Sequence, residues 1–108
     1  MGTRNISGYD DTLDGVIVAL CRDFERRETA VGDGKCSTRT SMEYKYINSR
    51  LLGAAMEIVG EDARAYIHEI GERVGYAYSA IDQISESTYK QAKKEVKLNI
   101  AKKLHMMD

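Results

Sequence analysis

The clearest hydrophobic pattern in the chain lies close to its C-terminus. Ser85 precedes it, and a serine hydroxyl at this place can accept a hydrogen bond from a free N–H group of the first helical turn. Apolar side chains then recur at intervals of three and four residues, which places them on one face of a helix. This face contains Tyr89, Ala92, Val96, Ile100 and Leu104. The pattern predicts an amphipathic helix that runs from Ser85 to about His105 and docks through this face.

Two further helices are predicted in the first 60 residues. The first is capped by Asp11 or Thr12 and ends before Gly32. Its core face contains Leu13, Val16, Ile17, Leu20 and Phe24. The second begins between residues 37 and 41, with Gly60 as its C-cap. Its core face contains Tyr44, Ile47, Leu51, Ala54, Ala55 and Ile58.

A third helix is predicted to follow directly, because Glu61 and Asp62 suit the start of a helix. Its core face contains Ala63, Tyr66, Ile67, Ile70 and Val74. Gly75 either ends this helix or kinks it. We expect a break or a kink near Gly75; if the helix ends there, residues 76–83 form a short separate helix.

The helical spacing of these apolar residues predicts an all-α fold, a small bundle of four to five helices. The chain has 108 residues, enough for one core, so residues 1–108 are expected to form a single domain. Residues 1–10 are polar and are expected to be disordered. A hydrophobic content of 43% and the lack of proline fit a globular protein with uninterrupted helices.

Charge is distributed unevenly along this chain. The net charge is −1, so overall electrostatics favours no class of partner. From Ser85 onward, however, there are six lysines and three acidic residues. Several of these lysines fall on a face beside the apolar one, where they could contact DNA phosphates. The alternative is that they form an ordinary solvated helix face.

The predicted nucleic-acid-binding residues all lie between Ser85 and Lys97 of this basic helix. Hydroxyl and amide side chains could contact phosphates or base edges, and the lysines could supply positive charge. The set is Ser85, Ser87, Thr88, Tyr89, Lys90, Gln91, Lys93, Lys94 and Lys97. The predicted partner is double-stranded DNA.

Other residues that could carry chemistry fit ordinary structural roles. His68 lacks the glutamate three residues earlier that a helical di-metal site would use, because Ala65 stands there. Glu69 and Glu72 have the spacing of an exposed helix surface. Residues 32–35 lack the spacing and the preceding strand of a phosphate-binding loop. We therefore expect no catalytic site, no metal and no cofactor.

The cysteines and the hydropathy pattern favour a cytoplasmic location. Cys21 and Cys36 are too far apart to form a zinc-binding pair. No apolar run approaches the roughly 20 residues of a membrane span. Residues 1–9 lack the apolar segment of a signal peptide. We expect no membrane partner.

The C-terminal segment resembles a known class of regulators. The resemblance is carried by Ile84-Ser85-Glu86-Ser87-Thr88-Tyr89-Lys90, then Lys93-Lys94-Glu95-Val96 and Ala101-Lys102-Lys103-Leu104-His105. This pattern is similar to the C-terminal module of ArpU-like phage late-gene regulators and of related proteins similar to the DNA-binding region of sigma factors. The resemblance implies a helix-turn-helix within residues 76–105.

Two functional hypotheses follow from the sequence. The first is a non-enzymatic DNA-binding transcriptional regulator of phage or prophage type that acts through the helix starting at Ser85. The second is a helical protein-interaction or assembly protein, which would include homo-oligomers, with no nucleic-acid role.

Overall fold

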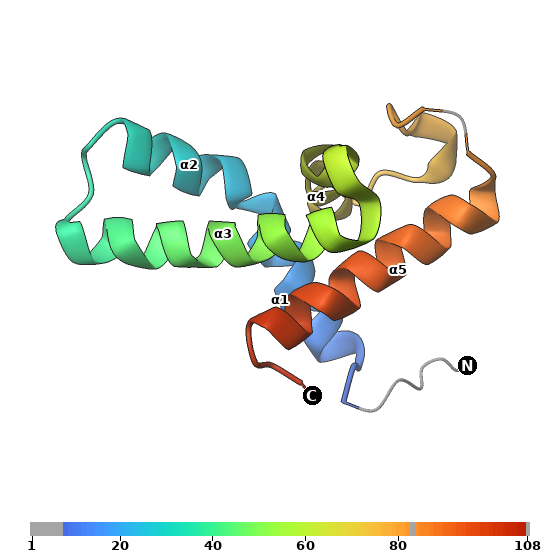
Figure 1. The fold of residues 1–108 in the computed structure, drawn as a ribbon, viewed down its shortest axis with the longest axis horizontal. Helices are drawn as coiled ribbons and strands as arrows, with labels where there is room; N and C mark the ends of the chain where they lie inside the picture. The colour runs from blue at the N-terminus through green and yellow to red at the C-terminus, as the bar shows by residue number, and fades with distance from the viewer. Residues whose placement is uncertain (1–7, 83, 108) are drawn as a thin grey trace.

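The computed structural model describes residues 8–82 and 84–107. Its elements are α1 (Asp11–Arg22), α2 (Phe24–Gly32), α3 (Thr38–Val59), the 3-10 turn η1 (Gly60–Asp62), α4 (Ala63–Gly71), the 3-10 turn η2 (Tyr76–Tyr78) and α5 (Glu86–Lys103). Only Asp23 separates α1 from α2, and α3, η1 and α4 follow one another without a gap. The predicted all-α class is confirmed for these ranges. The predicted four to five helices form three continuous helical stretches (Figure 1).

The α1–α2 stretch begins one residue earlier than predicted and is broken in the middle. The Asp10 side chain caps α1 by accepting a hydrogen bond from the Leu13 amide at 2.9 Å. The buried residues of this stretch include Ile17, Val18, Cys21 and Phe24. Val16 was predicted in the core but is exposed, because α1 turns the neighbouring face toward α4 and α5.

The disorder predicted for residues 1–10 can be compared with the structure only at residues 8–10. Residues 1–7 lie outside the described residues. Tyr9 packs against the core, and its hydroxyl donates a hydrogen bond to Asp14 at 2.7 Å. The ordered contacts of the described chain therefore begin ahead of α1.

The longest helix, α3, has the predicted limits. Ser37 caps it by accepting a hydrogen bond from the Thr40 amide, and Gly60 ends it with a positive φ of 61°. Its C-terminal half contributes Leu51, Ala54 and Ala55 to the core, but the predicted core residue Ile58 is exposed. Its N-terminal half runs beside α2, away from α4 and α5 (Figure 1).

The next helix ends earlier than predicted. α4 stops at Gly71 rather than near Gly75. Arg73 adopts a left-handed conformation, and the Val74 amide donates back to the Glu69 carbonyl, which is the Schellman end of a helix. Gly71 packs so closely on α1 that an added Cβ would lie 2.6 Å from the Arg22 nitrogen. The helix therefore ends where it crosses α1.

The segment between α4 and α5 is not the predicted helix. It contains only the short turn η2 and then extended chain, while the predicted helix end at Gln83 lies outside the described residues. A helix-turn-helix joins two helices by a turn of 3–4 residues, whereas residues 72–85 separate α4 from α5. The helix-turn-helix is therefore not confirmed.

The C-terminal helix itself follows the prediction. Ser85 caps α5, and Val96 and Ile100 are fully buried beneath it. α5 crosses the C-terminal half of α3 (Figure 1). Within residues 8–82 and 84–107, every helix is too short or too polar to span a lipid bilayer.

Candidate interaction surfaces

The hydroxyl groups at the start of α5 are used mainly within the helix end. The Ser85 Oγ accepts a hydrogen bond from the Thr88 amide at 3.2 Å and donates one to the Thr88 hydroxyl at 2.8 Å. Ser87 is exposed and lies 3.3 Å from the same Ser85 oxygen. Ser85 and Thr88 therefore act first as a cap.

Tyr89, predicted to contact DNA, belongs to the core. Its side chain is buried, and its ring packs against the rings of Tyr66 and Tyr76. Its hydroxyl donates a hydrogen bond to Glu69 at 2.6 Å. Burial and this bond raise the pKa of Tyr89 to about 12. The helical spacing correctly placed Tyr89 on the docking face, whereas its inclusion among the DNA-contacting residues required an accessible side chain.

Glu69 was predicted on the surface, and this is wrong as well. Its carboxylate is buried and accepts hydrogen bonds from the Ser79 hydroxyl at 2.6 Å and the Ala80 amide at 2.8 Å. Burial opposes ionisation, but these bonds, that from Tyr89 and the nearby Lys93 charge outweigh it. The net effect holds the pKa of Glu69 below its ordinary value. The charged group thus ties the α4–α5 connector to both helices.

Two of the four predicted DNA-binding lysines fold back onto the protein. The Lys93 ammonium donates a hydrogen bond to the Val74 carbonyl at 2.7 Å and lies over the Tyr89 ring. Lys97 pairs with Asp14 of α1 at 2.9 Å, and both side chains are half-buried. Burial lowers the pKa of Lys93. Both lysines therefore have structural partners that a phosphate would have to displace.

The remaining predicted residues do face solvent. Lys90 pairs with Glu86 at 2.8 Å across an exposed turn, and Gln91 donates a hydrogen bond to Glu95. Lys94 is exposed, and in the described part of the chain no carboxylate forms an ion pair with it. The structure therefore leaves Lys90 and Lys94 as the accessible part of the predicted lysine face.

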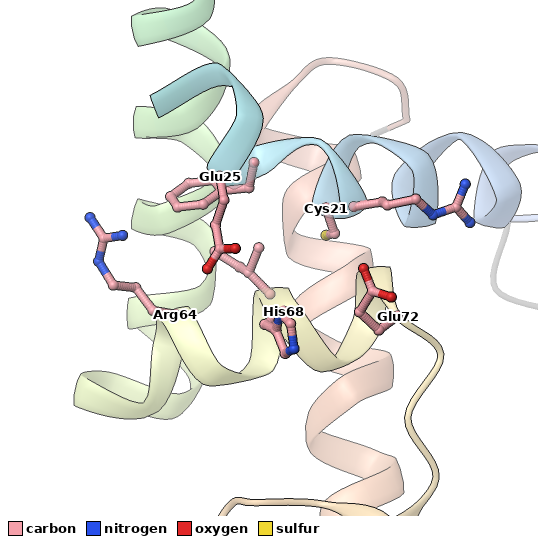
Figure 2. A pocket seen from close by; sticks show the side chains of 8 residues that line it. Cys21, Glu25, Arg64, His68 and Glu72 are labelled. Atoms are coloured by element: carbon pink, nitrogen blue, oxygen red, sulfur yellow. The ribbon is translucent and has the colours of Figure 1, made fainter. Parts of the chain in front are cut away.

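A small cavity lies between the α1–α2 junction and α4. It has a volume of about 80 Å³. Figure 2 shows His68 on α4, and Glu72 directly after it, opposite Cys21 on α1 and Glu25 on α2. Pockets for drug-sized ligands usually measure roughly 300–1,000 Å³. This cavity is too small for such a ligand.

The chemistry around this cavity is also unreactive. Cys21 is buried, which raises the pKa of its thiol to about 12, and a thiol must ionise to act as a nucleophile. Arg64 is held by two hydrogen bonds to Glu28, at 2.8 and 3.0 Å. Among the residues described, no group of three or more His, Cys, Asp or Glu side chains could hold a metal ion.

A surface that the sequence analysis did not single out lies on α3. Met42, Tyr46 and Met56 are 66%, 46% and 54% exposed, although all three are large and mainly apolar. Ser49 and Gly53 lie between them and are exposed too. The five positions alternate by four and three residues, which puts them in a strip about 80° wide, since each residue turns a helix by about 100°. We call this strip the α3 stripe.

Charged residues beside the α3 stripe differ between its two ends. From residue 38 to residue 50, α3 carries Arg39, Lys45 and Arg50 against one acidic residue, Glu43. From residue 51 to the end of η1, every charged residue is acidic: Glu57, Glu61 and Asp62. Alternating apolar residues with flanking charges are typical of a helix that pairs with another helix. This spacing is visible in the sequence and could have indicated the surface.

No protein-family model matches this chain, nor does any curated protein or solved structure. The resemblance of its C-terminal segment to phage regulators therefore stays a prediction.

Proposed function

We propose that this protein is a helical protein-interaction module that binds its partner through the α3 stripe. The observation that supports this proposal is the exposure of Met42, Tyr46 and Met56 in line on one helix face. Scattered apolar residues are normal on a protein surface, whereas an aligned set of large ones is typical of an interface. The core of the domain forms on the opposite face of α3, so the stripe serves binding rather than folding.

The energetics of the stripe favour binding over solvation. Burying a Met side chain completely contributes about 1.5–3 kcal/mol, so the exposed parts of these three side chains could contribute a few kcal/mol together. Arg50 already lies over the Tyr46 ring, 5.0 Å from its centroid, and holds that ring upright at the surface. Preorganised aromatic side chains are common at the centre of protein interfaces.

The position of the stripe makes it accessible. The N-terminal half of α3 packs beside α2 in a hairpin that extends away from the rest of the bundle (Figure 1). The Asn48 side chain donates to the Phe24 carbonyl at 3.0 Å and accepts from Arg27 at 2.7 Å. These bonds stiffen the hairpin, so a partner would meet a rigid helix and lose little entropy in ordering it.

DNA binding is a second candidate function, supported by the exposure of Lys90 and Lys94 on α5. Ser87, Thr88 and Gln91 face solvent on the same part of this helix. Two lysines can make fewer phosphate contacts than the four lysines that the sequence analysis predicted. The net charge of −1 adds no general attraction to DNA. The α3 stripe therefore has the stronger support.

The test of the proposed function is a comparison of binding by matched surface variants. Three tagged chains are compared: the wild type, Val16→Lys, and the double variant with Met42→Lys and Met56→Lys. Each is expressed in its native cells beside untagged copies of the wild-type chain. Val16→Lys is the control, because Val16 is also apolar and exposed but lies on α1. We expect the wild type and Val16→Lys to retain the same partner and the double variant to lose it. Equal recovery by all three chains, or recovery of none, would overturn the proposal.

A further inference from the structure

We propose that the partner of the α3 stripe is a second copy of this chain, bound antiparallel about a two-fold axis at Ser49. This inference rests on the proposed function and names the partner of the same surface. Ser49 is the middle position of the stripe, seven residues after Met42 and seven before Met56. An antiparallel copy centred on Ser49 therefore brings Met42 of each copy to Met56 of the other.

The shape of the stripe is complementary to itself in this arrangement. Tyr46 lies three residues before the centre and Gly53 four residues after it, so the two positions face each other between copies. A Cβ placed on Gly53 would meet no atom within 4 Å, so space is open above this residue. The exposed Tyr46 ring of the second copy can occupy that space. Small residues opposite large ones are what close helix packing requires.

The charges agree with the antiparallel direction. Arg39 and Glu57 are about five helical turns apart at 3.6 residues per turn, so both lie on the same side of the stripe. In the proposed pair, Arg39 of one copy lies within about 3 Å, measured along the helix axis, of Glu57 of the other. Arg39 pairs with Glu43 at 3.6 Å, and its side chain is 90% exposed, so it can reorient. Glu57 already pairs with Lys103 at 2.8 Å and accepts a hydrogen bond from Asn99, but its side chain is 52% exposed and can accept a further contact from Arg39.

A parallel pair would bring like charges together. Arg39, Lys45 and Arg50 of one copy would then face the same residues of the other, and the acidic ends would also meet. Juxtaposed like charges oppose association. The two Gly53 positions would face each other and leave a gap. In the antiparallel pair, Arg50 of each copy lies beside its counterpart, but its guanidinium is already placed over the Tyr46 ring. The Arg39–Glu57 contact and the fit of Tyr46 to Gly53 therefore favour the antiparallel direction.

The size of the stripe predicts a weak, reversible dimer. The distance from Met42 to Met56 is about 21 Å along the helix, at 1.5 Å per residue. A contact of this length buries less surface than the roughly 1,600 Å² of a standard stable interface. We expect a dissociation constant on the order of micromolar, which means that the chain is monomeric when dilute and dimeric when concentrated.

Directed disulfides test both the partner and the direction. Three variants with one added cysteine each, Met42→Cys, Ser49→Cys and Met56→Cys, are made with Cys36→Ser, which removes the more accessible of the two free thiols and leaves the buried Cys21. Under mild oxidation, Ser49→Cys should form a covalent dimer by itself. Met42→Cys and Met56→Cys should cross-link with each other at least tenfold more than either does alone. Ser87→Cys on α5 is the exposed control and should remain monomeric.

Sedimentation equilibrium of the wild-type chain is the companion measurement, because it needs no substitution. The apparent mass should rise from that of one chain to that of two over micromolar concentrations, and Val16→Lys should behave in the same way. Self-linking of Met42→Cys would overturn the antiparallel direction. A mass of one chain at all concentrations would overturn the second-copy inference. In that case, the proposed function would still stand if the wild-type chain bound a different protein in native cells and the double variant with Met42→Lys and Met56→Lys did not bind it.

Discussion

The buried carboxylate of Glu69 accepts a hydrogen bond of 2.6 Å from the hydroxyl of Tyr89. This contact joins α4 to α5, while the other bonds of the same carboxylate hold Ser79 and Ala80 of the connector. A carboxylate is tolerated in this environment because each of its oxygens has donors. One charged side chain that is hidden from solvent therefore holds the middle of the connector, while Lys93 bonds the Val74 carbonyl at its start.

Removing the Tyr89 hydroxyl should destabilise the protein. Tyr89→Phe keeps the packed ring but leaves Glu69 with one donor fewer, at an expected cost of about 1–3 kcal/mol in the free energy of unfolding. Urea unfolding measures this difference. Tyr78→Phe is the matched control, because Tyr78 is 86% exposed, and its stability should change by less than about 0.5 kcal/mol. Equal stability of the two variants would show that the Glu69–Tyr89 bond is absent in solution.

The same carboxylate predicts a pH dependence. The pKa of Glu69 is lower in the folded protein than its ordinary value of 4.5, so the ionised form favours folding. Its contribution should be complete above about pH 5.5 and should decline as the pH falls through the folded-state pKa. The difference in unfolding free energy between wild type and Glu69→Gln should therefore shrink in acid. A difference that grows below pH 4.5 would contradict a lowered pKa.

The crossing of α1 and α4 should not tolerate a methyl group at Gly71. A Cβ there would lie 2.6 and 2.7 Å from Arg22 backbone atoms, which cannot rotate away. Gly71→Ala should lower the unfolding free energy by about 1–3 kcal/mol, as overpacking does. Gly15→Ala, in the exposed part of α1 with no atom within 4 Å, should raise it by up to about 1 kcal/mol. Changes of the same sign in both variants would show that the helices do not meet at Gly71.

Local sequence signals predicted the helices well where the decisive contacts are also local. The caps at Ser37 and Ser85 and the C-cap at Gly60 act within one turn, and the structure contains all three. The end of α4 could not be found in this way. The helix ends at Gly71, where it meets α1 in a contact between residues far apart in the sequence, and the chain turns away at the left-handed Arg73. Gly75 was the more obvious helix-breaking residue in the sequence, but α4 has already ended before it.

The side chains of α5 show the same difference between local contacts, which the sequence predicts, and long-range contacts, which it does not. Helical spacing correctly placed Val96 and Ile100 in the core. It could not show that Lys93 reaches the Val74 carbonyl, because that carbonyl is positioned by the α4–α5 connector. The α3 stripe was missed because apolar residues on two sides of a helix look the same in sequence whether they face a core or a partner.

The DNA-binding hypothesis now predicts a smaller effect than the original lysine face would have given. Lys90→Gln with Lys94→Gln removes at most two phosphate contacts. The slope of log affinity against log salt should shrink by about 1.8, at 0.9 per contact with duplex DNA. Lys102→Gln, near the end of α5, is the control and should leave the slope unchanged. No duplex binding at low salt by the wild-type chain would dismiss this hypothesis.

The central claim, that the α3 stripe is a binding surface, is tested most directly by photo-cross-linking in native cells. A photoreactive amino acid replaces Ser49, in the middle of the stripe, and in a separate chain replaces Ser87, which is exposed on α5. After irradiation, we expect a discrete adduct from position 49 and none of similar yield from position 87. An adduct with twice the mass of the chain identifies a second copy, and another mass identifies a different protein. No adduct at position 49, or equal adducts at both positions, would contradict the claim.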